Sequence, residues 1–246
     1  MNETPPPFDG APPPAHLHPR VVPWRHALAW YEEALRLFKR APGTWVALAF
    51  VTIASELALK MAPGAVSLLA EIVTPLVACG LIYAAAAVDR GAAPSLFLAV
   101  AAFRAPPGAI AAIVASALVT FAAEAFAAWW IAGANLFDPS RATTSLSPAA
   151  VAGISAIGIL ASLPVMFVAL HVLFERVRAG AAFAASWNAF ALNTPPLLAY
   201  SAASLVLLGF GLATMGLGLL LAMPLWAAST YAAWKDIFGI RDAPSG

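Results

Sequence analysis

Three glutamates within apolar stretches of the chain are the residues best placed to do chemistry: Glu56, Glu71 and Glu124. An acidic side chain inside a bilayer costs about 2.5–3.5 kcal/mol on insertion scales unless it is paired, protonated or hydrated, so such residues are functional candidates by default. Counted along the expected spans, all three lie toward the outer side of the membrane. If their side chains converge, they form an intramembrane polar site for a cation or a proton.

Each glutamate also has a simpler interpretation. Glu56 and Lys60 are four residues apart, so they face the same side of a helix and can pair with each other. Glu71 and Glu124 can lie at the depth of the lipid headgroups, where a charge is hydrated. The discriminating feature is whether the three carboxylates face one shared cavity.

The remaining polar residues do not indicate an enzyme. His171 and Glu175 lie near the end of an expected span and can form either a proton relay or a helix-end hydrogen bond. The sequence contains no glycine-rich phosphate loop followed by lysine, no His-Glu-x-x-His, no Cys-x-x-Cys and no Gly-x-Ser-x-Gly. We therefore expect no enzymatic activity, no cofactor and no metal.

The composition indicates that the chain is folded in a bilayer. Hydrophobic residues make up 62% of the 246 residues and charged residues 10%, and the mean hydropathy is +0.84. A soluble domain is typically about half apolar and about a quarter charged, so the composition disfavours a soluble enzyme. The net charge of +1 gives no overall attraction to nucleic acid. We expect a multi-pass, all-α membrane protein.

A helix that crosses a membrane needs about 20 mostly apolar residues. Six such helices are predicted, and the last two share one apolar block that is too long for a single helix. The predicted spans are 44–58 (continuing to 61), 66–88, 108–131, 149–174 and two within 195–233, with a turn near 214–216. A single span followed by a re-entrant loop is the alternative for the last block.

The basic residues orient this topology. With both termini in the cytoplasm, the inside segments hold 11 of the 13 lysines and arginines, and the outside segments hold only Lys60 and Arg141. This bias agrees with the positive-inside rule. The predicted organisation is a disordered, proline-rich cytoplasmic tail over 1–24, a six-span membrane domain over 25–239 and a cytoplasmic tail over 240–246.

The six spans also show an internal repeat. An amphipathic segment precedes each odd-numbered span, at 27–43, 95–108 and 183–196, and is expected to lie at the cytoplasmic interface. In the first of these segments the apolar stripe consists of Leu28, Tyr31, Leu35 and Phe38. Each even-numbered span contains one proline and ends in an acid–base couple; the prolines are Pro75, Pro164 and Pro224. The pattern predicts three repeated hairpins, each preceded by an amphipathic interfacial helix.

Three segments resemble an uncharacterised family of proteobacterial six-helix inner-membrane proteins. They are Trp30-x7-Phe38-Lys39-Arg40-x-Pro42-x-x-Trp45, Ala185-Ser186-Trp187-x5-Asn193-x-x-Pro196-Leu197 and Ala228-Ser229-x-Tyr231-x-Ala233-Trp234-Lys235-Asp236-Ile237-Phe238. The resemblance covers roughly 25–239 and implies residence in a bacterial inner membrane. It implies no reaction or substrate.

Two functions remain open from the sequence. One is a non-enzymatic membrane module that organises lipid or membrane proteins through its basic, aromatic inner face. The other is a small transporter or channel that uses the intramembrane glutamates. We expect the lipid bilayer as the main partner, with a membrane protein or a second copy of the chain as further candidates, and no nucleic acid.

Overall fold

The structure is a computed structural model that describes residues 18–136 and 146–240, and all regular structure in these residues is helical. The first third forms α1 (His26–Arg40), α2 (Pro42–Lys60), the 3₁₀-helix η2 (Gly64–Leu69) and α3 (Ala70–Asp89). The middle forms the 3₁₀-helix η3 (Leu96–Arg104), α4 (Pro107–Ala132), α5 (Pro148–Ser162), the 3₁₀-helix η5 (Leu163–Val165) and α6 (Val168–Phe174). The last third forms α7 (Ala179–Leu192), α8 (Thr194–Ala213) and α9 (Leu219–Ile237).

Five helical segments are long and apolar enough to cross a membrane: Pro42–Lys60, Val66–Asp89, Pro107–Ala132, Pro148–Val165 and Thr194–Ala213. The predicted all-helical fold with membrane-spanning helices is therefore confirmed at this level. The predicted sixth span corresponds to α9, which is not among the five, because its second half carries hydroxyl and charged side chains up to Lys235 and Asp236. The turn between α8 and α9 occupies 214–218, so the last apolar block forms two helices and not one.

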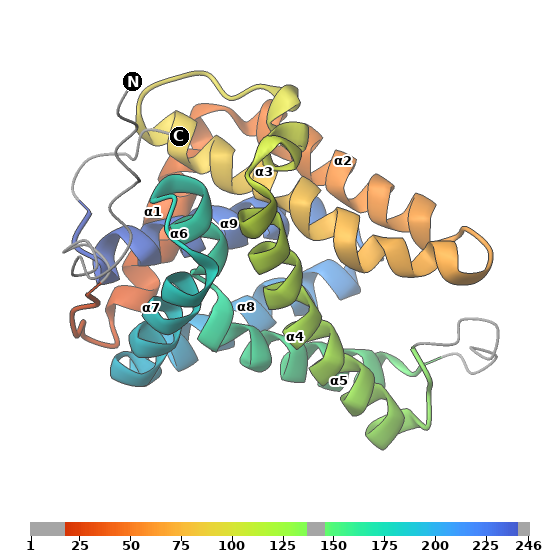
Figure 1. The fold of residues 1–246 in the computed structure, drawn as a ribbon. Coiled ribbons are helices and arrows are strands. Elements are labelled where there is room, and N and C mark those ends of the chain that lie inside the picture. Colours follow the sequence, from red (N-terminus) through yellow and green to blue (C-terminus); the bar gives the residue numbers. More distant parts are fainter. Residues whose placement is uncertain (1–17, 137–145, 241–246) are drawn as a thin grey trace, which may run out of the picture.

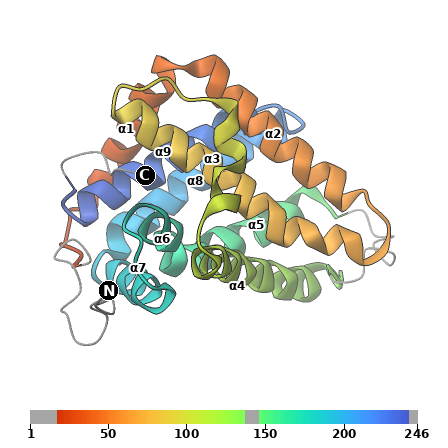
Figure 2. The same cartoon turned by 45° about the horizontal axis from the view of Figure 1, so that its top comes forward.

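The ends of the helices define two ends of the molecule (Figures 1 and 2). The α2–α3 and α8–α9 turns and the C-terminal end of α4 lie on one side, which we call the turn end. The start of α1 and the C-terminal end of α9 lie on the other side, which we call the charged end because Arg20, His26, Asp89, Lys235 and Asp236 meet there.

The amphipathic segment 27–43 differs from the prediction in the face that it buries. Helix α1 packs along α9, and its buried residues are Ala27, Trp30, Ala34 and Leu37, at 0–2% exposure. Of the predicted stripe, Leu28 and Leu35 are exposed. The small side chains of two alanines let the helices approach closely and leave room for Trp30 between them. Helix α1 therefore belongs to the bundle and presents a second apolar face outward.

The three predicted copies of the repeat differ in conformation, and the repeat is not confirmed. The segments before the odd-numbered spans are an α-helix in α1, a 3₁₀-helix in η3 and an α-helix in α7. Pro75 and Pro224 lie inside the continuous helices α3 and α9, whereas Pro164 lies in η5, where the predicted fourth span breaks. Because proline has no N–H and its ring crowds the preceding turn, it can either kink a helix or end it.

A close contact between α3 and η3 fixes the middle of the bundle. A Cβ atom built on Gly80 would lie 2.7 Å from the Cα of Ala99 and 2.9 Å from the carbonyl oxygen of Leu98. Both are backbone atoms, so the contact cannot be relieved by a side-chain rotation. The absence of a side chain at Gly80 is what allows η3 to lie against α3.

We predict that Gly80→Ala destabilises the protein by about 1–3 kcal/mol, because the added methyl group overpacks this contact. The matched control is Gly209→Ala in α8, where an added Cβ has nothing within 4 Å. The control should be stabilised by about 0.5–1 kcal/mol, because alanine loses less conformational freedom in a helix. Thermal unfolding in detergent measures both. Equal unfolding midpoints for the two variants would contradict the close packing.

Candidate functional site

At the turn end, two of the predicted glutamates form local ion pairs. The Nζ atom of Lys60 lies 2.6 Å from a carboxylate oxygen of Glu56, one helical turn earlier in α2. The same Nζ atom lies 3.7 Å from a carboxylate oxygen of Glu71, in the first turn of α3. Lys60 and Glu56 are both partly exposed, so these pairs tie the α2–α3 hairpin at its surface.

Glu124 lies on the neighbouring hairpin and faces α5. Its side chain lies directly over Gly158, where an added Cβ would be 2.1 Å from a carboxylate oxygen of Glu124. Lys60 interacts electrostatically with all three glutamates, so they lie in one region of the molecule. However, the cavity of about 210 Å³ at this end is lined by Lys60 and Glu71, and neither Glu56 nor Glu124 lines it. The three carboxylates therefore do not face this cavity together.

His171 lies among aromatic rings near the charged end. It has no exposed surface, and its ring meets Phe238 edge-on at 4.5 Å between centroids. The indole N–H of Trp234 points at its Nδ1 atom over 3.5 Å. His171 therefore fills the core between α6 and α9.

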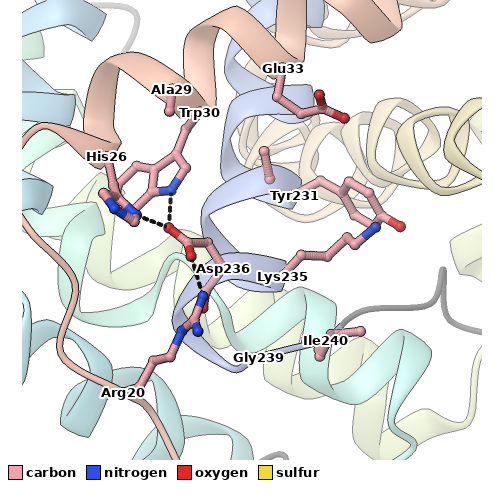
Figure 3. A pocket seen from close by; sticks show the side chains of 11 residues that line it. Arg20, His26, Ala29, Trp30, Glu33, Tyr231, Lys235, Asp236, Gly239 and Ile240 are labelled. Atoms are coloured by element: carbon pink, nitrogen blue, oxygen red, sulfur yellow. Dashed lines mark hydrogen bonds and ion pairs between the residues drawn. The ribbon is translucent and has the colours of Figure 1, made fainter.

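The charged end is organised around Asp236, the residue before the last one of α9 (Figure 3). One carboxylate oxygen of Asp236 lies 2.6 Å from Nδ1 of His26 and accepts a hydrogen bond of 2.9 Å from the indole N–H of Trp30. The other oxygen lies 2.5 Å from the guanidinium of Arg20, which also donates to the Asp236 carbonyl oxygen over 2.7 Å. One carboxylate thus joins α9, α1 and the segment before α1.

Burial alone would raise the pKa of the Asp236 carboxyl, but the hydrogen bonds and charge of its partners outweigh burial and hold that pKa below its ordinary value of 3.8. The carboxylate is therefore charged in the folded protein at neutral pH. It stabilises the folded state, because the charged carboxylate has a lower free energy there than in the unfolded chain.

A second acidic residue ties α3 to α9. Asp89, at the end of α3, accepts a hydrogen bond of 2.9 Å from the hydroxyl of Tyr231 and lies 2.5 Å from the Nζ atom of Lys235. The Asp89 and Lys235 side chains are only 12% and 21% exposed, so water screens this ion pair weakly. The acid–base couples noted in the sequence at the ends of α3 and α9 are thus contacts between these helices.

The chain before α1 lies across the charged end. The backbone N–H of Arg20 donates to the carbonyl oxygen of Ile237 over 2.8 Å. Fully buried Asn193, between α7 and α8, accepts from the N–H of Val22 over 2.8 Å and donates to the carbonyl oxygen of Arg20 over 3.0 Å. Arg20 and Val22 of the predicted tail are therefore placed by specific hydrogen bonds, while residues 1–17 of that tail are outside the described residues.

A pocket of about 420 Å³ lies between α1 and α9 at the charged end, and we call it the α1–α9 pocket. Figure 3 shows its polar side chains: basic groups from both helices and from the preceding segment, with two acidic groups among them. The lining residues are Arg20, His26, Ala29, Trp30, Glu33, Tyr231, Ala232, Lys235, Asp236, Gly239 and Ile240. The sequence does not predict this pocket, because its residues come from two parts of the chain, 20–33 and 231–240, that are more than 190 positions apart.

The described residues contain no group of three or more histidine, cysteine, aspartate or glutamate side chains that could hold a metal ion. Comparisons with protein-family models, with curated proteins and with solved structures find no match to the chain.

We predict that Asp236→Asn destabilises the protein by about 2 kcal/mol at pH 7, because the buried indole N–H of Trp30 and the partly exposed Arg20 and His26 lose a charged acceptor. Since the pKa of Asp236 is lower in the folded state, its contribution is fully present above about pH 4 and is lost as the pH falls through the folded-state pKa. The difference between wild type and variant should therefore shrink below pH 4, measured as thermal unfolding midpoints in detergent.

The control for this measurement is Glu32→Gln, which removes an acidic group from an exposed position of α1. It should leave the unfolding midpoint close to that of the wild type at both pH values. A gap between wild type and Asp236→Asn that stays constant down to pH 3 would contradict the assigned role of the carboxylate.

Proposed function

We propose that this chain is a non-enzymatic, multi-pass module of a bacterial inner membrane that binds the headgroup of an anionic phospholipid in the α1–α9 pocket. In this proposal α9 is the sixth span, the three hairpins are copies of one unit, and the charged end faces the cytoplasm. The orientation is supported by the charges, because 11 of the 13 basic residues lie in the segments assigned to the cytoplasmic side. Lipid is the partner, with a second copy of the chain or another membrane protein as a further partner.

The α1–α9 pocket is the observation that carries this proposal. A guanidinium carries five N–H donors, and Arg20 uses its Nε and one terminal nitrogen to bind Asp236, so donors on the other terminal nitrogen stay available. Its side chain is 60% exposed. The ammonium of Lys235 has three donors, of which one points at Asp89. A phosphodiester can therefore accept hydrogen bonds from both residues without breaking the ion pairs that hold them.

The outer face of α1 supports a place at the membrane surface. Trp24, Leu28 and Leu35 are exposed, and the exposed cations Arg25 and Lys39 lie at the two ends of the same segment. An apolar face flanked by basic residues is typical of a helix at the headgroup boundary. Lipids on this face can reach the pocket from the side of α1.

The alternative function is a small transporter or channel that uses Glu56, Glu71 and Glu124. The electrostatic interaction of Lys60 with all three glutamates favours transport, because it places them in one region. The short ion pair of Glu56 with Lys60 and the position of Glu124 over Gly158 favour local structural roles. We therefore rank lipid binding above transport.

Lipid binding is tested by native mass spectrometry of the detergent-solubilised protein titrated with phosphatidylglycerol or phosphatidylethanolamine. We expect preferential retention of phosphatidylglycerol. The variant Lys235→Gln, which removes one basic side chain from the pocket, should weaken this retention about five-fold. One basic side chain near an anionic headgroup contributes about 1 kcal/mol to binding. Arg104→Gln, which removes an exposed cation at the end of η3 that does not line the pocket, is the matched control. Equal retention in the two variants would contradict the proposed site.

Transport is tested with Glu71→Gln and Glu124→Gln in proteoliposomes. We expect both variants to show the same proton and sodium leak as the wild type, because neither carboxylate is proposed to line a pathway. Glu32→Gln on α1 controls for the loss of one charge. A changed leak in Glu71→Gln or Glu124→Gln, with unaltered thermal stability, would establish the alternative function instead.

A further inference from the structure

A third cavity, of about 380 Å³, lies among the apolar helices of the bundle. It is bounded by α3, α4, α9 and the junction between α5 and α6. Pro75 lines it directly, and Pro164 and Pro224 are the immediate neighbours of the lining residues Val165 and Met223. We call it the proline cavity.

The depth of the proline cavity follows from the positions of its lining residues along two helices. Its lining residues in α3 run from Pro75 to Ile82, roughly 8–18 Å from the start of that helix at 1.5 Å per residue. In α9 they run from Met223 to Thr230, roughly 6–17 Å from its start. A hydrocarbon core is about 30 Å thick, so these ranges place the cavity near the middle of the bilayer.

Most of the polar side chains that line the cavity are already hydrogen-bonded within the protein. The hydroxyl of Ser116 donates to the carbonyl oxygen of Ile113 over 2.8 Å, and that of Ser162 donates to the carbonyl oxygen of Ile159 over 2.7 Å. The indole nitrogen of Trp226 is buried without a hydrogen-bond partner, so it can offer one donor. The wall therefore offers few hydrogen bonds to an occupant. Water needs two to four polar partners to stay in a cavity, so these walls do not suit it.

The cavity opens on the surface of the bundle. Ile82, Ala117 and Thr120 line it and are half-buried, while the next residue of α4, Leu118, is exposed and lies outside the lining. At this depth the surrounding medium is lipid chains. An elongated apolar group that enters from the bilayer satisfies both the depth and the chemistry of the wall, because it fills the space with van der Waals contacts and needs no hydrogen bond.

We infer that an acyl chain of a bilayer phospholipid occupies the proline cavity. The site is distinct from the α1–α9 pocket. It uses Met223, Trp226, Ala227 and Thr230 of α9, whereas the pocket uses Tyr231, Ala232, Lys235 and Asp236. Thr230 and Ala232 are two positions apart, which at about 100° per residue places them on opposite sides of the helix. The inference does not depend on the proposed headgroup site.

Photocrosslinking tests the inference directly. The full chain is reconstituted in vesicles of phosphatidylglycerol and phosphatidylethanolamine that contain a phosphatidylcholine with a photoreactive diazirine near the middle of one acyl chain. Adducts are mapped by peptide mass spectrometry. We expect lipid adducts on the α9 peptide that carries Trp226 and Ala227.

Two variants make the test specific. Ala117→Phe fills the cavity from α4 and should abolish adducts on the α9 peptide, whereas Leu118→Phe adds bulk on the lipid-facing side and should leave them intact. Thermal unfolding identifies any variant that does not fold, and Ala117→Val, which adds less volume, then replaces Ala117→Phe with a partial loss expected. Unchanged α9 adducts in the filled variant would overturn the inference. So would the absence of lipid adducts there in the wild type, or crosslinks to a second protein chain in their place.

Lys235→Gln should leave the α9 adducts unchanged. Failure of the headgroup site and failure of the acyl-chain site are thus separate results.

Discussion

The paired, partly buried carboxylate of Asp236 is the interaction on which the charged end depends. A charge removed from water must be paired and hydrogen-bonded, and Asp236 satisfies this requirement with groups from α1 and from the segment before it. These contacts fix the face of α1 that meets α9 and keep residues 20–22 against the end of the bundle. The same contacts hold Arg20 in the lining of the α1–α9 pocket and leave some of its donors available, while Asp89 holds Lys235 there.

Among the described residues, the ion pairs that join one helix to another lie at the two ends of the molecule. At the charged end, Asp89 and Asp236 join α3 and α1 to α9, the least apolar of the long helices. At the turn end, Lys60 closes the α2–α3 hairpin by pairing with glutamates of both helices. Between the two ends the proline cavity has apolar walls. This distribution is typical of a protein that places polar contacts at both headgroup layers and offers packing surfaces to lipid chains between them.

The sequence was sufficient to predict the helical class and the membrane helices, because a run of about 20 apolar residues has few other structural solutions. It was also sufficient to suggest that Glu56 and Lys60 pair, since that interaction depends only on helical spacing. The sequence was not sufficient to predict which face of α1 is buried. Leu28 and Trp30 belong to two different apolar faces of this helix, and packing against α9 decides which of them is buried. Pro164 could kink or break its helix, and the sequence alone does not distinguish the two. The Arg20–Asp236 contact joins positions 216 residues apart, beyond the reach of any local pattern.

The most direct test of lipid-headgroup binding is a high-resolution electron cryomicroscopy structure of the protein in nanodiscs that contain phosphatidylglycerol and phosphatidylethanolamine. We expect density for a lipid phosphate in the α1–α9 pocket, within hydrogen-bonding distance of Arg20 and Lys235. A pocket that contains only water, or one filled by a segment of protein, would contradict the proposal that this protein binds lipid headgroups.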